Sequence, residues 1–331
     1  MADQSKAFNV AQSPSAAEPE LPHVESGSCN MVIVIATFGR DSLLSRTLES
    51  ISTVRIPSIL TRVIVAENGP EPVVREVAES FKGRIPIEYL YVPYCSKSAA
   101  LNAALERLTD EFIVFFDDDV RLSEDTLLEY SKLAGRQRHG VFYGGRCEVD
   151  CPEPPPDWVK RYLPAPAKGW SLGDEERDLT TGGALGFNWA AYAQDIKGVG
   201  SFDLMCGPGT PANGDETNVE NKLLESGVRG VYSPNAVVWH FVPPERCSAD
   251  FAVVQKKRNE MGRGIALAER SFFRRAVQQV CTRVELMAYT LARGVVAFNK
   301  ESRRYYHFNI CAERLAAKLE GMRLGAERLS R

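Results

Sequence analysis

The first 120 residues contain four unbroken runs of aliphatic and aromatic residues, separated by three stretches of helical character. The runs are NMVIVIATFGR (30–40), RVIVAENGP (62–70), IPIEYLYVP (85–93) and EFIVFFDDDV (111–120). Because polar residues do not alternate with apolar ones inside these runs, they predict strands that are buried on both faces. The helical stretches are 41–54, 71–83 and 96–108. Strands and helices that alternate in this way predict a doubly wound α/β sheet flanked by helices.

The second part of the chain follows a different pattern. Residues 151–170 are rich in proline, which excludes a regular helix or a central strand there. Residues 180–196 combine a glycine-rich turn with a predicted helix. A Gly/Pro-rich loop at 206–214 precedes a further predicted helix, and the apolar stretch at 228–244 predicts one more strand.

These patterns divide the chain into three parts. Residues 1–29 are rich in Ala, Ser, Pro and Glu and lack periodicity, which predicts a flexible tail. Residues 30–247 form the predicted α/β domain, and 248–331 form a predicted helical region. From residue 256 to 331 there are 17 Lys and Arg against 7 Asp and Glu, although the whole chain has a net charge of −3. Such a basic region indicates either an anionic partner or a solvated helical face.

The composition favours a protein that works inside the cell. The eight cysteines are scattered and lack the paired spacing of a zinc site, so we expect free thiols in a reducing compartment. The N-terminal segment lacks the apolar core of a secretion signal, and no run of 18 apolar residues occurs. We therefore expect a cytoplasmic protein with no membrane-spanning segment and no nucleic-acid partner.

Three adjacent carboxylates, Asp117, Asp118 and Asp119, follow the fourth predicted strand. In a doubly wound sheet, ligands bind beyond the carboxyl ends of the strands. Side chains alternate along an extended chain, so we expect Asp117 and Asp119 to point to one side and Asp118 to the other. A pair of carboxylates with this spacing can hold a hard divalent cation, which also removes their repulsion. The alternative is an acidic, solvated turn before a helix.

Further polar residues lie at other strand tips or begin a helix. Glu67 follows the second strand, where it is either a hydrogen-bond acceptor for a ligand or part of an Asn-Gly turn. Asp215 and Glu216 begin a predicted helix, a position that stabilises carboxylates and also suits a general base. The flexible loop at 206–214 would let this segment close over a substrate. His240 is either a strand-end residue or a ligand for a metal or a phosphate.

Six sequence blocks occur in a fixed order between about Met31 and Arg246: VIVIATFGR, IVAENG, KSAALNAAL, FFDDDV, GSFDLMCGPGTPANGDET and VWH. Together they resemble the inverting nucleotide-sugar glycosyltransferases of family 2, which have a GT-A fold. The resemblance implies a GT-A-like mixed sheet, a divalent metal such as Mn²⁺ or Mg²⁺, and a nucleotide-diphosphate donor, with a UDP-sugar favoured. It also implies sugar transfer to a hydroxyl group in the synthesis of a glycan or glycolipid.

The resemblance assigns donor-binding roles to residues near the strand tips. Thr37 and Arg40 match the start of the nucleotide site. Glu67 stands where the family usually has the Asp that accepts hydrogen bonds from the base, and it is longer by one methylene group. Lys97 lies in the block that lines the nucleotide-diphosphate site.

The Asp triplet and His240 take the metal and donor roles in this resemblance. Asp117 and Asp119 match the metal and ribose carboxylates, with Asp119 as the more direct metal ligand. His240 matches a position that supports the metal or the diphosphate. Asp118 falls on the donor side, where a purely structural role is left open.

The implied catalytic base is Glu216. The family usually has the second residue of a Glu-Asp pair at this place, and here the order is Asp215 then Glu216, so Asp215 is an alternative base. The implied acceptor side contains Gly183, Asn188 and Trp189.

Alternatives remain for the C-terminal segment and for the function. Residues 271–298 place Arg on one side and Phe, Val and Leu on the other, which indicates a membrane-surface helix, a helical lid or a dimer contact. A lipid-linked acceptor would suit the first of these. A sugar nucleotidyltransferase would carry a Gly-rich, Lys/Arg-containing loop after the first strand, which ATFGRDSLL matches poorly. A non-catalytic sugar- or nucleotide-binding module would not need both the Asp triplet and the Asp215–Glu216 pair.

Overall fold

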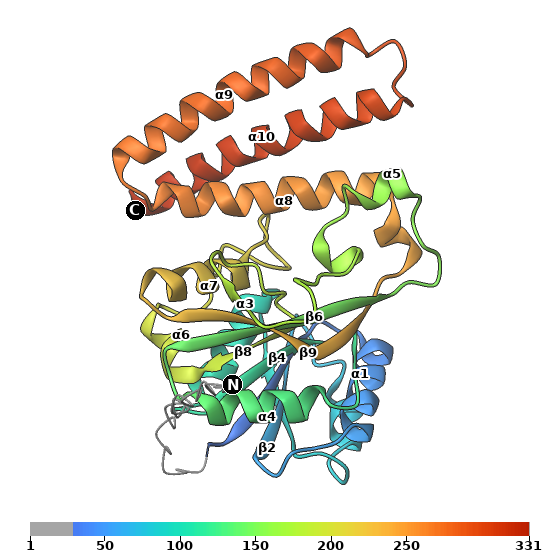
Figure 1. Cartoon of the computed structure of the whole chain (residues 1–331), viewed down its shortest axis with the longest axis vertical. Coiled ribbons are helices and arrows are strands. Elements are labelled where there is room, and N and C mark those ends of the chain that lie inside the picture. The colour runs from blue at the N-terminus through green and yellow to red at the C-terminus, as the bar shows by residue number, and fades with distance from the viewer. Residues whose placement is uncertain (1–28, 331) are drawn as a thin grey trace, which may run out of the picture.

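The structure, a computed structural model, describes residues 29–330 and centres on one mixed sheet of nine strands (Figure 1). The tail expected at 1–29 lies outside the described residues except for Cys29. The strands are β1 (Met31–Thr37), β2 (Leu60–Asn68), β3 (Ile87–Val92), β4 (Phe112–Asp117), β5 (Val120–Leu122), β6 (Val141–Asp150), β7 (Arg177–Leu179), β8 (Asn188–Tyr192) and β9 (Arg229–Phe241).

The strand order is β3-β2-β1-β4-β8-β6-β9-β5, with β7 paired to β9. The four strands predicted from the first aliphatic runs form the parallel half of the sheet, β3-β2-β1-β4. Strand β8 is antiparallel to both of its neighbours, β4 and β6. The carboxyl ends of β1, β2 and β4 therefore meet at one edge, where Thr37 lies beside Glu67 and Ala36 beside Asp117.

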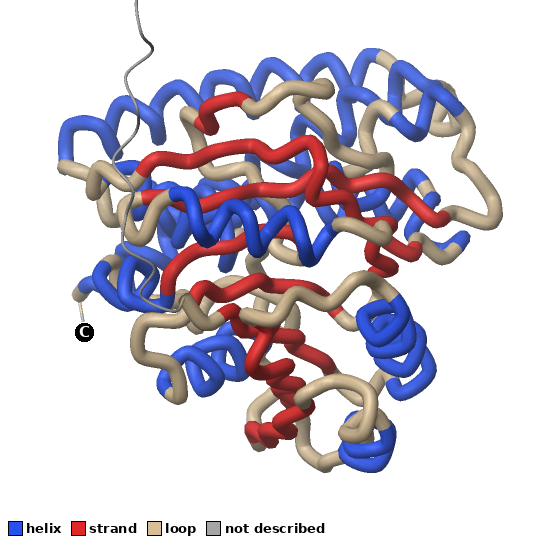
Figure 2. Tube along the Cα trace, turned by 60° about the horizontal axis from the view of Figure 1, so that its bottom comes forward, coloured by secondary structure: helices blue, strands red, loops and turns tan. Residues whose placement is uncertain are grey.

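Helices cover both faces of the sheet, as Figure 2 shows. Leucines and other apolar residues of α1, α2 and α4 pack on one face, and those of α3, α6 and α7 pack on the other. The helices are α1 (Asp41–Thr53), α2 (Arg75–Ser80), α3 (Lys97–Glu106), α4 (Thr126–Arg136), α5 (Asp157–Lys160), α6 (Ala193–Gly198), α7 (Asp215–Glu225), α8 (Ala249–Ala268), α9 (Phe272–Val295) and α10 (Arg303–Leu329). Two short 3₁₀ turns are η1 (Ala165–Ala167) and η2 (Pro244–Cys247).

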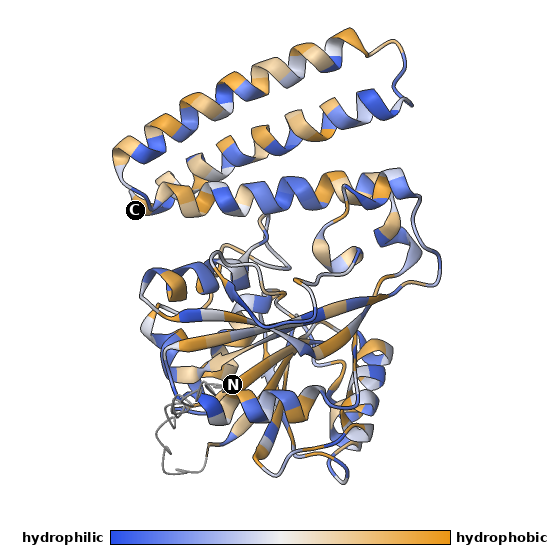
Figure 3. Cartoon of the chain, in the orientation of Figure 1, coloured by the Kyte–Doolittle hydropathy of each residue, from blue (hydrophilic) through white to orange (hydrophobic). Residues whose placement is uncertain are grey.

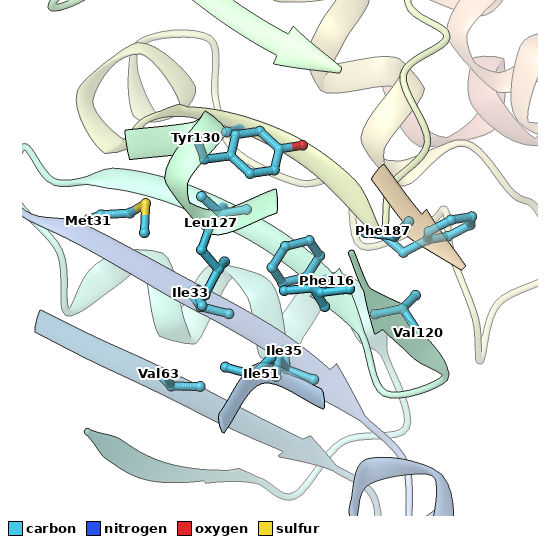
Figure 4. Close-up of a cluster of buried hydrophobic side chains, with 14 of the residues drawn as sticks. Met31, Ile33, Ile35, Ile51, Val63, Phe116, Val120, Leu127, Tyr130 and Phe187 are labelled. Carbon is cyan, nitrogen blue, oxygen red and sulfur yellow. The ribbon is translucent and has the colours of Figure 1, made fainter. Parts of the chain in front are cut away.

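The central strands are buried on both faces, as their uninterrupted apolar character predicts. Ile33 and Ile35 of β1 point into one core cluster, and Val32 and Val34 point into the other. Figure 4 shows the first cluster, in which Phe116 lies between β1 and α4. Fully burying one such side chain contributes about 1.5–3 kcal/mol, so this pairing of sheet and helices stabilises the strand tips that carry the polar residues.

The helix predicted within residues 180–196 is only partly correct. Asn188–Tyr192 is the central strand β8, and only the six residues of α6 after it are helical. The side chains of β8 alternate between two buried faces: Trp189 and Ala191 pack on one side, Ala190 and Tyr192 on the other. Because both faces are apolar, the segment lacks the alternation of polar and apolar residues that identifies a half-buried strand.

The basic C-terminal region consists of three long helices, as expected. Helix α10 lies between α8 and α9, and α8 lies nearest the sheet (Figure 1). A side chain at Gly264 would overlap the backbone of Lys318, and one at Gly321 would overlap the carbonyl of Met261, so the two backbones cross in direct contact. No helix within residues 29–330 is long and apolar enough to cross a membrane.

We expect Gly321→Ala to lower the free energy of unfolding by about 1–3 kcal/mol, because its new methyl group has no space against α8. Gly294→Ala in α9 is the matched control, since nothing lies within 4 Å of a methyl group there. Both changes add the same helix propensity, and only the first adds a clash. Urea unfolding of the two variants tests this; equal stability would mean that the crossing of α8 and α10 adapts freely.

Candidate active site

The Asp triplet begins at the last residue of β4 and continues into a turn. Strand β4 ends at Asp117, so the alternation expected from an extended chain does not continue to Asp119. Asp117 faces Lys97, whereas Asp118 and Asp119 both contact Arg40. Lys97 and Arg40 thus offset the mutual repulsion of the three carboxylates.

Asp118 is completely buried and acts as an internal anchor. Thr37 donates a hydrogen bond of 2.5 Å to its carboxylate, and the guanidinium of Arg40 contacts both of its oxygens. Burial raises the pKa of Asp118 to about 7, although the charge of Arg40 opposes this. Since no part of Asp118 is exposed, the structure gives it the structural role rather than a direct contact with a donor.

Asp119 has two arginines beside one carboxylate oxygen and a histidine beside the other. Its Oδ2 lies 3.0 Å from Arg40 and 3.3 Å from Arg246, and its Oδ1 lies 3.3 Å from Nε2 of His240. Burial alone would raise the pKa of Asp119, but His240 and the two arginines hold it well below its usual range. The carboxylate is therefore ionised at neutral pH.

His240 and Asp119 together fit a divalent cation. The carbonyl of Pro166 lies 2.8 Å from Nδ1 of His240 and can only accept, so Nδ1 carries a proton and Nε2 is the ring nitrogen that faces Asp119. Oδ1 of Asp119 is buried and has no hydrogen-bond donor within the described chain. A carbonyl-oriented imidazole beside an unsatisfied carboxylate oxygen is the arrangement found around protein-bound metals. The ring is also fixed by stacking on Phe187 at 4.5 Å.

Two protein ligands do not make a complete metal centre. No group of three or more His, Cys, Asp or Glu side chains within residues 29–330 is placed to hold a metal ion. A cation at Asp119 and His240 would therefore need most of its ligands from water or from a bound ligand such as a diphosphate.

Lys97 links the tip of β4 to the start of α7. Ser96 caps α3 by accepting a hydrogen bond from the backbone of Ala99, which makes Lys97 the first residue of that helix. The ammonium lies 2.7 Å from Asp117 and 2.6 Å from Glu216, and the side chains of Lys97 and Glu216 are only 11 % and 13 % exposed. Burial would lower the pKa of Lys97, but the two carboxylates raise it well above its ordinary value.

Asp215 and Glu216 begin α7, as predicted, but they differ in charge. Burial, reinforced by the neighbouring Glu216, raises the pKa of Asp215 well above its ordinary value. Burial would also raise the pKa of Glu216, yet Lys97 and a hydrogen bond from Asp215 lower it to about 2. The environment therefore favours the ionised form of Glu216 and the protonated form of Asp215.

Glycines create the space around these two carboxyl groups. A methyl group at Gly186 would overlap the carboxylate of Glu216, and one at Gly207 would lie 2.8 Å from Oδ2 of Asp215. Gly214 precedes the helix with φ of 108°, a conformation that disfavours other residues.

The loop at 206–214 is held in place, contrary to the expectation of a segment that closes over a substrate. Ser98 donates a hydrogen bond of 2.8 Å to the carbonyl of Cys206, and Arg258 of α8 donates to Gly207 and Asn213. A side chain at Gly262 would overlap the carbonyl of Asn213. The glycines of this region thus permit close backbone contacts, and α8 fixes the approach to Glu216.

Glu67 does not point to a ligand as the resemblance implies. It is completely buried and accepts hydrogen bonds from the backbone amides of Val73 and Val74 and from the hydroxyl of Tyr89. The extra methylene group of Glu lets the carboxylate reach the start of α2. Glu67 therefore shapes the loop beside the site, and no side of it is open to a base.

The structure separates the three expected acceptor-side residues. Trp189 is fully buried and stacks on Phe115 at 4.6 Å. Asn188 is also fully buried, and its amide bonds the hydroxyl of Tyr130 and two backbone carbonyls. Both residues have packing roles in place of the expected acceptor contact. Gly183 lies in the loop beside α7, where its amide donates to Glu220.

The sequence reasoning missed three residues of the site: Arg246, Gly186 and Glu220. Arg246 contacts Asp119 from η2, just after the strand that carries His240. Glu220 lies one helical turn after Glu216, and burial raises its pKa well above the ordinary value. The i, i+4 spacing of Glu216 and Glu220 was a signal that both face the same side of α7.

Solved structures show which known fold this chain has. The mannosyltransferase PcManGT from Pyrobaculum calidifontis, in complex with GDP-Man and Mn²⁺, matches with a TM-score of 0.54 and 16 % identity over 89 % of this chain and 86 % of that one. GalNAc-T7 with UDP, GalNAc and Mn²⁺ matches with a TM-score of 0.53 and 11 % identity over 70 % of this chain and 48 % of that one, so the match spans about half of GalNAc-T7. The fold is that of the GT-A glycosyltransferases, which confirms the predicted fold class.

The sequence itself identifies the family. The model of the family described as "Glycosyltransferase like family 2" matches residues 29–262, and the chain belongs to this family and is a glycosyltransferase. The succinoglycan biosynthesis protein ExoM of Rhizobium meliloti (strain 1021) is 26 % identical over 293 residues, which cover 86 % of this chain and 88 % of ExoM. The family predicted from the sequence is confirmed. A glycosyltransferase is therefore the correct alternative, and the sugar nucleotidyltransferase and the non-catalytic binding module are not.

We expect Lys97→Met to move the acidic limb of the pH profile of kcat/KM upward by about 1–3 pH units. Glu216 has a pKa of about 2 and is ionised throughout the usual assay range; without Lys97, burial dominates and raises that pKa, so a proton inactivates the base at higher pH. Lys82→Met, which breaks a surface pair with Glu79, is the control. An unchanged acidic limb in Lys97→Met would show that Lys97 does not keep Glu216 ionised.

Proposed function

We propose that this protein is a metal-dependent, inverting glycosyltransferase that moves a sugar from a nucleotide-diphosphate donor, with a UDP-sugar favoured, to a hydroxyl acceptor. The observation that carries the proposal is the bridge of Lys97 between Asp117 and Glu216, with 2.7 and 2.6 Å to the two carboxylates. This bridge holds the ionised carboxylate of Glu216 beside the strand ends where a donor would bind.

The donor side consists of Thr37, Arg40, Lys97 and Asp117 at the carboxyl edge of the parallel strands. Arg40 and Arg246 are each about one third exposed, so they can contact the phosphates of a donor while they stay near Asp119. Within the donor side, Lys97 is the residue that contacts the proposed base, Glu216. The solved relatives that carry UDP or GDP-Man support a nucleotide donor of this kind.

Asp119 and His240 would hold the divalent cation, Mn²⁺ or Mg²⁺, with Asp117 close by at the end of β4. When bound, such a cation supplies stabilisation for the negative charge of the leaving nucleoside diphosphate. Both solved relatives described above contain Mn²⁺, which supports this assignment.

Glu216 is the proposed general base. Its carboxylate accepts the proton of the acceptor hydroxyl while the hydroxyl oxygen forms a bond to the anomeric carbon. The bond from that carbon to the diphosphate oxygen breaks on the opposite face, so one step inverts the configuration. General-base assistance of this type contributes about 10²–10⁴-fold in rate. The raised pKa of Asp215 limits the negative charge at the start of α7.

The acceptor is proposed to be a growing glycan, carried on a lipid or free. ExoM is described as a succinoglycan biosynthesis protein, and the alignment covers most of both chains, which supports a role in polysaccharide synthesis. Gly183 and Gly186 lie beside Glu220 and Glu216, so the loop that holds them is the best candidate for the acceptor side.

We expect Glu216→Gln to keep donor binding and to lose turnover by about 10²–10⁴-fold, because it removes only the proton acceptor. The assay is nucleotide release from a panel of UDP-, GDP- and dTDP-sugars with Mn²⁺, in the presence of acceptor. Asp215→Asn is the matched comparison and should retain more activity, since burial and Glu216 raise the pKa of Asp215 and so favour its uncharged form.

Two results of this panel would contradict the proposal. Turnover of Glu216→Gln close to wild type, with loss in Asp215→Asn, would make Asp215 the base. If the wild-type protein released no nucleotide from any donor of the panel, the proposed class of donor would be wrong.

We expect His240→Gln to raise the Mn²⁺ concentration needed for half-maximal activity by roughly 10–100-fold, because the cation loses its oriented imidazole. His307→Gln is the control, since His307 lies on α10 beside Tyr162, outside the site. Chelator should abolish wild-type activity and added Mn²⁺ should restore it. Full activity in chelator would show that the arginines around Asp119 suffice without a metal.

A further inference from the structure

Helix α9 turns a continuous apolar stripe to the solvent. The stripe consists of large side chains that recur every three or four residues and are 43–90 % exposed: Phe273, Val277, Val280, Val284, Met287, Leu291, Val295 and, just beyond the helix, Phe298. This spacing places all of them on one side of a helix of about 36 Å length. Figure 3 shows hydrophobic residues recurring along α9, the helix that lies farthest from the sheet.

The opposite side of α9, which faces the protein, mixes polar residues with the half-buried Leu286 and Tyr289. Thr282 is the buried residue of the helix, and Arg293 bonds Asn309 and Glu313 of α10. Gln278 accepts a hydrogen bond from Lys318. An ordinary surface helix keeps its outer side polar, whereas α9 leaves a second, continuous apolar stripe that something else must cover.

Positive charge surrounds the stripe. Residues 270–304 contain eight Lys and Arg against two Glu. Arg274, Arg283, Lys300 and Arg304 are exposed, and within residues 29–330 none of them forms a salt bridge. On a helical projection, Arg274 and Arg283 border the stripe on opposite sides.

We propose that α9 lies in the headgroup region of an anionic lipid bilayer, with the stripe in contact with the acyl chains and the flanking arginines on the lipid phosphates. A long helix with a large apolar face and a basic border is the form that such interfacial helices take. Each Lys or Arg near an anionic surface adds to the attraction. Among the described residues no helix crosses a membrane, so the contact is peripheral.

A second copy of the chain is the less suitable occupant of the stripe. Pairing two α9 helices face to face would bring the arginine borders of both copies together, and Glu285 is the single acidic residue of this helix. Like charges at such short range disfavour association. An anionic surface has the complementary charge.

The stacking of the C-terminal helices connects this surface to the site. Helix α10 packs between α9 and α8, and α8 fixes the loop at Gly207 and Asn213 that leads to Glu216 (Figure 1). The bilayer would therefore lie on the side of the molecule opposite to the parallel half of the sheet.

Cosedimentation of the full chain with lipid vesicles tests the proposal. We expect binding to vesicles of phosphatidylcholine with phosphatidylglycerol, weaker binding to phosphatidylcholine alone, and weaker binding in 0.5 M NaCl. The stripe variant replaces Val280, Val284, Met287 and Leu291 by Gln, and its partition coefficient should fall on the order of a hundredfold. The border variant Arg274→Gln/Arg283→Gln should lose mainly the preference for anionic vesicles.

The control variant replaces four exposed apolar residues elsewhere by Gln: Ile56, Val73, Leu204 and Val254. It should bind vesicles like wild type, and circular dichroism should show the same helix content for all variants. Wild-type protein that stays in the supernatant with anionic vesicles would overturn the proposal, as would undiminished binding of the stripe variant. Sedimentation velocity without lipid that shows a dimer for wild type and a monomer for the stripe variant would also overturn it, because a second copy would then cover α9.

Discussion

The buried ammonium of Lys97 is the interaction on which the site depends. It joins the end of β4 to the first turn of α7, and without it Asp117, Asp215 and Glu216 would be three neighbouring acids with little access to water. A buried charge without a partner costs several kcal/mol, and a paired one forms only where the geometry is fixed. The parallel sheet and the cap of α3 by Ser96 supply that fixed geometry.

Other buried carboxylates of the site are also paired with fixed, positively charged or imidazole side chains. Arg40 joins Asp118 to Asp119, and Arg246 and His240 complete the partners of Asp119. The Asp triplet is thus neither a solvated turn nor an isolated cation site, but part of an alternating set of charges that spans the strand tips. A diphosphate that enters this set would exchange contacts with cations that are already in position, so little reorganisation is required.

The sequence predicted the parallel half of the sheet, the start of α7 and the helical C-terminal region, because long apolar runs and helix starts are local signals. It also selected Lys97, Asp119, Glu216 and His240 as candidates through their place in the chain, and the structure pairs Lys97 with Glu216 and Asp119 with His240. It could not predict that Glu67 bonds the start of α2, or that Asn188 and Trp189 lie inside the sheet, since these depend on which strands become neighbours. Arg246 was missed for the same reason: its partner Asp119 is 127 positions away.

The direct contact between Gly262 and the carbonyl of Asn213 ties the identity of the C-terminal helices to the active-site loop. A chimera could exchange the C-terminal region between relatives, in order to move an enzyme to another acceptor or location, by a junction at the end of β9. In this protein that junction would divide a packed unit. A functional chimera would have to carry the loop at 206–214, α8 and α10 from the same parent, because α8 and α10 also cross in direct contact at Gly264 and Gly321.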